Sequence, residues 1–143
     1  MVNEETSRKQ STNKIPLIRT EGVVKDLKKM PDGWAGNMSK KPTTKAVNKV
    51  KKVLAILESG RMPWPTITVI ANGGVMLTWL STTKDILLTV DTVGDIQFAT
   101  SHKKIDSASN EVVDRLDSEG SVTDMKALDY MMAWYAADTA SAC

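Results

Sequence analysis

The spacing of apolar residues changes once along this 143-residue chain, from a helical period to a period of two. Between Thr43 and Ser59 apolar residues recur every three or four positions, which is the pattern of a helix with one buried face. From Thr66 to Thr100 they alternate with polar residues, which is the pattern of β-strands with one buried face. The change predicts an α+β domain in which an amphipathic helix covers one face of an antiparallel sheet.

The helix predicted at Thr43–Ser59 has a recognisable start and end. Thr43 suits the N-cap position because its hydroxyl can accept a backbone N–H of the first turn. Gly60 follows the last periodic residue, and the Pro63-Trp64-Pro65 segment then requires extended chain. The expected apolar stripe consists of Ala46, Val47, Val50, Val53, Leu54 and Leu57.

Four short β-strands are predicted after this helix. The Asn72-Gly73-Gly74 turn can supply the positive φ angles of a tight hairpin. Short turns between consecutive strands favour a four-stranded antiparallel meander, with the helix packed across one of its faces. The predicted strands are Thr66–Ile70, Val75–Leu80, Ile86–Val90 and Ile96–Ala99.

Residues 107–139 are expected to form a C-terminal helical appendage. Ser109 is a candidate N-cap for a short helix. Ser121 and Asp124 resemble a capping box at the start of a second helix. The short helix would carry Val112, Val113 and Leu116, and the second helix would bury a stripe of Met125, Leu128, Met132 and Tyr135.

The N-terminal residues 1–20 are polar and aperiodic, and we expect them to form a flexible tail or arm. Residues 21–143 are expected to form a single α+β domain, with the helix and meander at 31–100. No apolar run approaches the roughly 20 residues of a membrane-spanning helix, and the N-terminus lacks the apolar segment of a secretory signal. The single cysteine, Cys143, fits a reducing compartment. These features predict a cytoplasmic protein without membrane contacts.

Few residues of this sequence are suited to catalysis. The one histidine, His102, falls in a polar turn after the last predicted strand, and the one thiol is that of Cys143. A zinc site needs three or four His, Cys or acidic ligands, which the sequence does not offer in a metal-binding spacing. We therefore expect no enzyme activity, no cofactor and no metal; a His102–Cys143 pair and a carboxylate-bound magnesium are the alternatives. The carboxylates in question are scattered as Asp85, Asp91, Asp95, Asp106 and Asp114.

The net charge of +2 conceals two halves of opposite sign. Residues 1–61 hold 14 Lys and Arg against 6 Asp and Glu, a net charge of +8, and residues 62–143 hold 5 against 11, a net charge of −6. The basic half indicates a surface for nucleic acid or for an acidic partner. A solvated helix face, or attraction between the two halves within the fold, would explain the charges equally. The candidate binding lysines are Lys41, Lys45, Lys49 and Lys52.

The C-terminal helix carries more methionine and aromatic residues than one buried face requires. Such residues are common at adaptable protein-binding surfaces. The candidate partner-binding residues are Tyr130, Met131 and Trp134 on this helix, together with Trp64 between its two prolines. The alternative is that these side chains belong to the core. The same helix could also join two copies of the chain in a homo-oligomer.

Several short motifs resemble a group of small proteins from phages and other mobile elements. The resemblance covers about residues 31–98. It implies no catalytic residue, because the group has no established activity. The group commonly has an acid where this chain has Thr78 and an acid where it has Ala35. The motifs are the D-G-W-x-G segment at Asp32–Gly36, the Pro42-Thr43 helix start, the Pro63-Trp64-Pro65 turn and the L-x-W strand at Leu77–Trp79.

The functional expectation combines these observations. We expect a non-enzymatic protein-binding module, encoded by a phage, that occupies a host complex, for example as an inhibitor of a defence system such as CRISPR. One alternative is a nucleic-acid-binding accessory protein that uses the basic helix. Another is a structural virion component that uses its N-terminal arm. The D-G-W-x-G segment itself is expected to be structural, with Trp34 packed as an anchor at the helix start.

Overall fold

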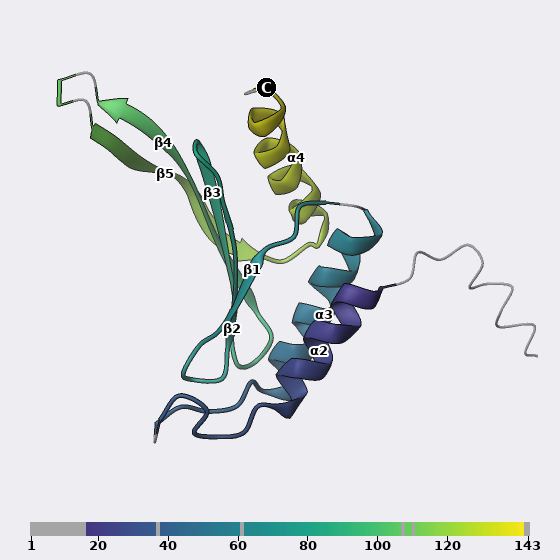
Figure 1. Cartoon of the computed structure of the whole chain (residues 1–143). Helices are drawn as coiled ribbons and strands as arrows, with labels where there is room; N and C mark the ends of the chain where they lie inside the picture. The colour runs from purple at the N-terminus through teal and green to yellow at the C-terminus, as the bar shows by residue number, and fades with distance from the viewer. Residues whose placement is uncertain (1–16, 37, 61, 107, 110, 142–143) are drawn as a thin grey trace, which may run out of the picture.

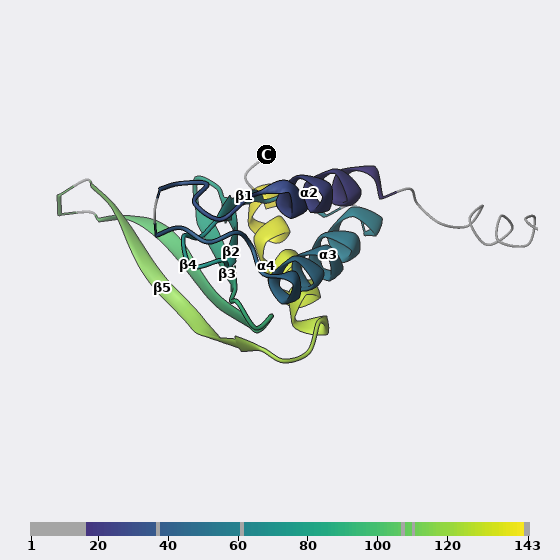
Figure 2. The ribbon, with the colours of Figure 1, turned by 90° about the horizontal axis from the view of Figure 1, so that it is seen from below.

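The computed structural model describes residues 17–36, 38–60, 62–106, 108–109 and 111–141, and it has two layers. A five-stranded antiparallel sheet forms one layer, and all the labelled helices lie on the same side of it (Figures 1 and 2). The α+β class is therefore confirmed, whereas the prediction of four strands was wrong. The helices are α2 (Ile18–Lys29), α3 (Thr44–Ser59) and α4 (Lys126–Ser141), and the strands are β1 (Thr66–Val69), β2 (Val75–Leu80), β3 (Lys84–Val90), β4 (Ile96–Asp106) and β5 (Glu111–Val122).

The sheet is a meander in the order β1-β2-β3-β4-β5, and each strand pairs with the next in the sequence. Residues directly opposite one another across paired strands point to the same face. Leu77 of β2, Leu88 of β3 and Phe98 of β4 are aligned in this way and face the helices. The period of two predicted for these strands is thus confirmed. The buried strand residues of this face are Val75, Leu77, Trp79, Ile86, Leu88, Val90, Ile96 and Thr100.

Helix α3 is the predicted amphipathic helix, and its bounds agree with the sequence to within one residue. The Thr43 hydroxyl accepts the Ala46 N–H at 3.1 Å, as an N-cap should, and donates to the Thr92 carbonyl at 2.7 Å. The second bond ties the start of the helix to the β3–β4 turn. All six residues of the predicted apolar stripe are buried against the sheet or the other helices.

Helix α2 was not predicted, because its start has no signal of its own in the sequence. Leu17 occupies the N-cap position and offers no side-chain hydrogen bond. The cap comes instead from Glu58 of α3, whose carboxylate accepts the N–H groups of Arg19 and Thr20 at 3.0 and 2.8 Å. These contacts place the start of α2 at the end of α3, so the two helices run antiparallel (Figure 1). Residues 18–20 of the expected tail thus belong to α2, whereas residues 1–16 lie outside the described residues.

Strand β5 replaces the short helix predicted after Ser109, and that prediction was wrong. Glu111–Val122 pairs with β4 along its whole length, with a register shift between Thr100 and Ser101. Strand β4 correspondingly continues to Asp106, past the predicted end at Ala99. The reason is tertiary: backbone groups of this segment bond to a neighbouring strand, which overrides a helical spacing of three apolar residues.

Gly120 of β5 lies opposite Phe98 of β4, and the aromatic ring covers it. A Cβ atom on Gly120 would come within 3.3 Å of Phe98 Cε1. An aromatic side chain across a strand glycine is a known way of filling the gap that the missing side chain leaves. Gly120 is therefore a packing position inside a strand.

The D-G-W-x-G segment forms a loop that is closed by its own hydrogen bonds. The half-buried Trp34 donates its indole N–H to the Lys40 carbonyl at 2.7 Å, and the Asp32 carboxylate accepts the Lys41 N–H at 3.0 Å. The Lys40 N–H then bonds to Ala71, and the Thr43 N–H to Gly73. These bonds hold the loop to the β1–β2 turn, which agrees with a structural role for the motif.

Candidate protein-binding groove

A groove lies where α4 faces the β4–β5 pair. Its first part is a hollow of about 380 Å³. The sheet contributes Thr100, Asp117 and Ser118, and α4 contributes Tyr130, Met131 and Trp134. The hydroxyl groups of Thr100 and Ser118 are 2.8 Å apart and bond to one another across the strands. The groove therefore has a polar strand side and an apolar helix side.

The second part of the groove is an adjoining hollow of about 300 Å³ with a cationic lining. The two hollows share Asp117 and Trp134, so that they follow one another along the β4–β5 pair. The lining of the second hollow consists of Thr83, Lys84, His102, Lys103, Lys104, Asp117 and Trp134.

Lys84 and Trp134 contact one another at the boundary between the two hollows. The Lys84 ammonium donates to the Trp134 carbonyl at 2.7 Å and lies 4.4 Å from the centre of the Trp134 ring. The second contact is a cation–π interaction. Trp134 is consequently half-buried and fixed, although α4 and β3 are distant in the sequence.

His102 and Asp117 form the other ordered pair of the second hollow. His102 Nδ1 lies 2.5 Å from Asp117 Oδ1, and both side chains are partly exposed. Asp117 falls at the register shift between β4 and β5, where the extra residue of a β-bulge stands. The bulge therefore directs the Asp117 carboxylate toward the histidine and the groove.

The Lys103 ammonium already has partners within the sheet. Its ammonium donates to the Ser81 carbonyl at 2.9 Å and lies 3.3 Å from Asp85 Oδ1. Tyr135 of α4 packs nearby, and its hydroxyl donates to the Leu80 carbonyl at 3.1 Å. Burial, followed by the charge of Asp85, raises the pKa of Tyr135 above its usual value of 10.0. This tyrosine anchors α4 to the sheet.

The structure brings three of the four candidate partner-binding residues together in one groove. Tyr130 is 79% exposed, and Met131 is 9% exposed at the base of the helix side. Trp64 lies elsewhere: it packs against the core, and the Arg19 guanidinium carbon is 4.2 Å from the centre of its ring. The predicted core stripe of α4 is buried at Leu128, Met132 and Tyr135.

The candidate lysines lie on the helical layer, away from the groove. Lys41 lines a small hollow at the start of α3 together with Lys28 of α2, a residue that the sequence analysis missed because α2 was missed. Among the described residues, no ion pair joins these lysines to an acidic group of the sheet or of α4. Lys45, Lys49 and Lys52 follow one side of α3 by their helical spacing.

The described part of the chain contains no cluster of three or more His, Cys, Asp or Glu side chains that could hold a metal ion. His102 instead pairs with Asp117. Cys143 and the side chains of Asp106 and Asp114 are not among those described. None of the described helices is long and apolar enough to cross a membrane.

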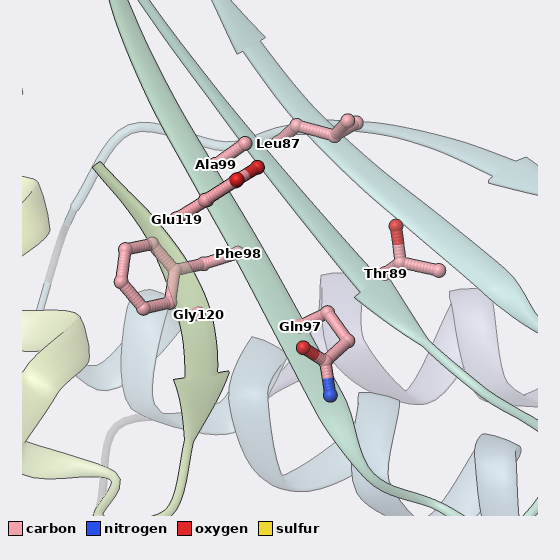
Figure 3. A pocket seen from close by; sticks show the side chains of 7 residues that line it. All are labelled: Leu87, Thr89, Gln97, Phe98, Ala99, Glu119 and Gly120. Atoms are coloured by element: carbon pink, nitrogen blue, oxygen red, sulfur yellow. The ribbon is translucent and has the colours of Figure 1, made fainter. Parts of the chain in front are cut away.

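The face of the sheet opposite the helices has a hollow of its own, of about 430 Å³. Leu87, Ala99 and Glu119 stand in line across β3, β4 and β5 and point the same way, whereas Phe98 points away from them (Figure 3). Thr89 and Gln97 form the next row. This second surface was not predicted from the sequence, because apart from Leu87 its residues are the polar and small ones that alternate with the buried residues.

Comparison with known proteins finds no matching family model, no matching curated sequence and no matching solved structure.

Proposed function

We propose that this chain is a non-enzymatic protein-binding module that works by covering part of another macromolecule. The groove between α4 and the β4–β5 pair is its contact surface. One observation carries the proposal: Tyr130, Met131 and Trp134 line a common groove, and Tyr130 is 79% exposed there. A large aromatic side chain left in water beside an apolar hollow is characteristic of an interface.

The composition of the groove suits a protein partner. Aromatic and methionine side chains are enriched at the centres of protein interfaces, where they bury a large area with few rotatable bonds. Met131 and Trp134 form an apolar wall opposite the strand side, where the Thr100 and Ser118 hydroxyl groups bond to one another. The Lys84 contacts fix Trp134 in advance, which lowers the entropic cost of binding.

The identity of the partner is proposed from the resemblance to small phage proteins. In that setting the partner is a host complex, and occupation of its working surface would inhibit it. A guide-RNA nuclease of a defence system is one such complex. The chain would then act in the cytoplasm of the host cell.

Affinity capture with matched variants tests this proposal. The full chain is immobilised and exposed to nuclease-treated host lysate, and captured proteins are identified by mass spectrometry. Tyr130→Ala should abolish capture of the specific partner, whereas Val93→Ser should not. Val93 is also an exposed apolar residue, at 59%, but it lies in the β3–β4 turn. If capture survives Tyr130→Ala and Trp134→Ala, the groove is not the contact surface.

A nucleic-acid-binding role is the second candidate, and it is favoured by the lysines of α3, which have no ion pair with a described residue. Exposed lysines without acidic neighbours attract phosphate groups, and such binding weakens steeply as salt concentration rises. The triple variant of Lys45, Lys49 and Lys52 to Glu should abolish it. Lys51→Glu is the matched control, because Lys51 lies about 100° around the helix from Lys52. The measurement is fluorescence anisotropy of a labelled DNA duplex at two salt concentrations.

A further inference from the structure

We infer that the groove accepts an extended segment of the partner protein in which an apolar side chain lies close to a carboxylate. This inference rests on the proposed function and names the chemistry of the segment. The apolar side chain would occupy the hollow beside Tyr130 and Met131, and the carboxylate would lie in the hollow beside Lys84 and Lys104.

The distribution of charge supports the carboxylate. Residues 62–143 hold only five Lys and Arg and have a net charge of −6, yet three of the five line the second hollow. Within that hollow Asp117 is already engaged by His102, and Lys103 is engaged by Asp85. A local excess of positive charge in an acidic part of the molecule selects an acidic ligand. The three lysines are Lys84, Lys103 and Lys104.

The contacts of Lys84 show that its ammonium is held in place without being neutralised. A lysine ammonium has three N–H donors. One of them bonds to the Trp134 carbonyl, and the other contact is the indole face, so neither partner carries a negative charge. Lys104 is exposed and has no ion pair with a described residue. Among the described residues, these two cations have no acidic partner, and Lys84 is already ordered.

The adjoining position of the two hollows sets the spacing in the ligand. The hollows share Trp134 and Asp117, so one peptide segment can reach both. An extended chain advances about 3.3 Å per residue. Because the hollows adjoin, we expect the apolar side chain and the carboxylate to lie within three residues of one another.

Selection of peptides tests the inference directly. A display library of random 12-residue peptides is selected on the immobilised full chain, and the most enriched sequence is synthesised. Enriched sequences should carry Asp or Glu within three positions of Leu, Met, Phe or Trp. Replacing the acid in the synthetic peptide by its amide should weaken binding about tenfold or more, the usual cost of losing a charged hydrogen bond.

Variants of the protein test whether the acidic side chain of the peptide binds in the groove. Lys104→Glu should weaken the acidic peptide about tenfold, a typical loss for a charge contact, and should have little effect on its amide form. Lys84→Met should weaken both forms, because it also releases Trp134, but it should weaken the acidic form more. Lys51→Glu, a charge reversal on α3 outside the groove, should leave both affinities unchanged. Circular dichroism of each variant checks that the fold is intact.

Each other outcome overturns the inference. It fails if enriched peptides are uncharged or basic, if no peptide is enriched, or if inorganic phosphate or an oligonucleotide displaces the acidic peptide, since the hollow would then be a phosphate site. If the enriched peptides were uncharged and their binding depended on Tyr130, the inference about the carboxylate would be wrong, but the groove would still be the contact surface of the proposed function. Peptides that bind independently of Tyr130 and Trp134 would remove both.

Discussion

The carboxylate of Glu58, near the end of α3, caps the start of α2 at Thr20. It accepts the Thr20 N–H at 2.8 Å and the Thr20 hydroxyl at 2.7 Å, and it also accepts the Arg19 N–H. A helix leaves its first N–H groups without intrahelical partners, and a residue in the helix's own chain segment normally satisfies them. Here the neighbouring helix does so, so that the first turn of α2 depends on a side chain of α3.

Replacing Glu58 by Ala should loosen α2 while leaving the sheet intact. The N–H groups of Arg19 and Thr20 would lose their acceptor, so the first turn should fray. Hydrogen exchange read residue by residue should show faster exchange of α2 amides and unchanged exchange in β2 and β3. Asp26→Asn is the control, because Asp26 is exposed on the same helix. Unchanged protection of α2 would contradict the capping role.

The same carboxylate should make the stability of α2 depend on pH. Burial acts to raise the pKa of Glu58, but the hydrogen bonds from Thr20 and Arg19 and the Arg19 charge lower it below its usual value of 4.5. A lowered folded-state pKa means that the contribution is present above pH 4.5 and is lost as pH falls through the folded-state value. Unfolding measured between pH 7 and pH 3 should show this loss in the parent chain. A chain with Glu58→Gln should lack that component.

Two glycine substitutions should have opposite effects. Gly73 has a φ of +99°, and a Cβ atom there would come within 2.9 Å of the Lys41 carbonyl oxygen. Gly73→Ala should therefore destabilise the chain, by about 1–3 kcal/mol from backbone strain alone. Gly22 lies inside α2 with nothing within 4 Å of its would-be Cβ atom, so Gly22→Ala should stabilise by about 0.5–1 kcal/mol. Chemical denaturation measures the free energy of unfolding of both variants. If both substitutions changed it in the same direction, the backbone at one of the two glycines would differ from the one described.

Two leucines of β2 should differ sharply in their contribution to stability. Leu77 is fully buried against the helices, whereas Leu80 is 69% exposed on the same strand. Leu77→Ala should cost about 2–5 kcal/mol, because it removes buried methyl groups and leaves a cavity. Leu80→Ala should change the free energy of unfolding by less than about 0.5 kcal/mol. If urea denaturation showed similar losses for the two variants, the core would not lie on the face of the sheet that carries Leu77.

Tyr135 should link the docking of α4 to alkaline pH. Its raised pKa means that the fold favours the neutral phenol, which donates to the Leu80 carbonyl. This contribution should be complete below pH 10.0 and lost as pH rises through the raised folded-state value. An ultraviolet titration at the tyrosinate band should show a late step that Tyr135→Phe removes. If the parent and the variant lose stability equally at high pH, the phenol does not anchor α4.

The elements that follow from local pattern were predictable from the sequence. Thr43 caps α3 as its hydroxyl chemistry predicts, and Gly60 follows the last helical residue, although its φ of −85° is open to any residue. The alternation from Val75 to Val90 places the predicted side chains on the covered face. These elements carry their own signals, because a helix stripe and a half-buried strand each leave a period in the sequence. The α4 candidates Tyr130, Met131 and Trp134 were visible for the same reason, as apolar residues beyond what one buried face needs.

The remaining features depend on contacts between distant residues, and only the tertiary structure decided them. Helix α2 exists in its place because Glu58 supplies its cap, and β5 is a strand because β4 offers a partner for its backbone. The groove likewise brings Trp134 to Lys84 and His102 to Asp117. Local periodicity in the sequence does not predict these pairs. Local periodicity determined which faces of the chain are apolar; long-range hydrogen bonding and packing decided what those faces meet.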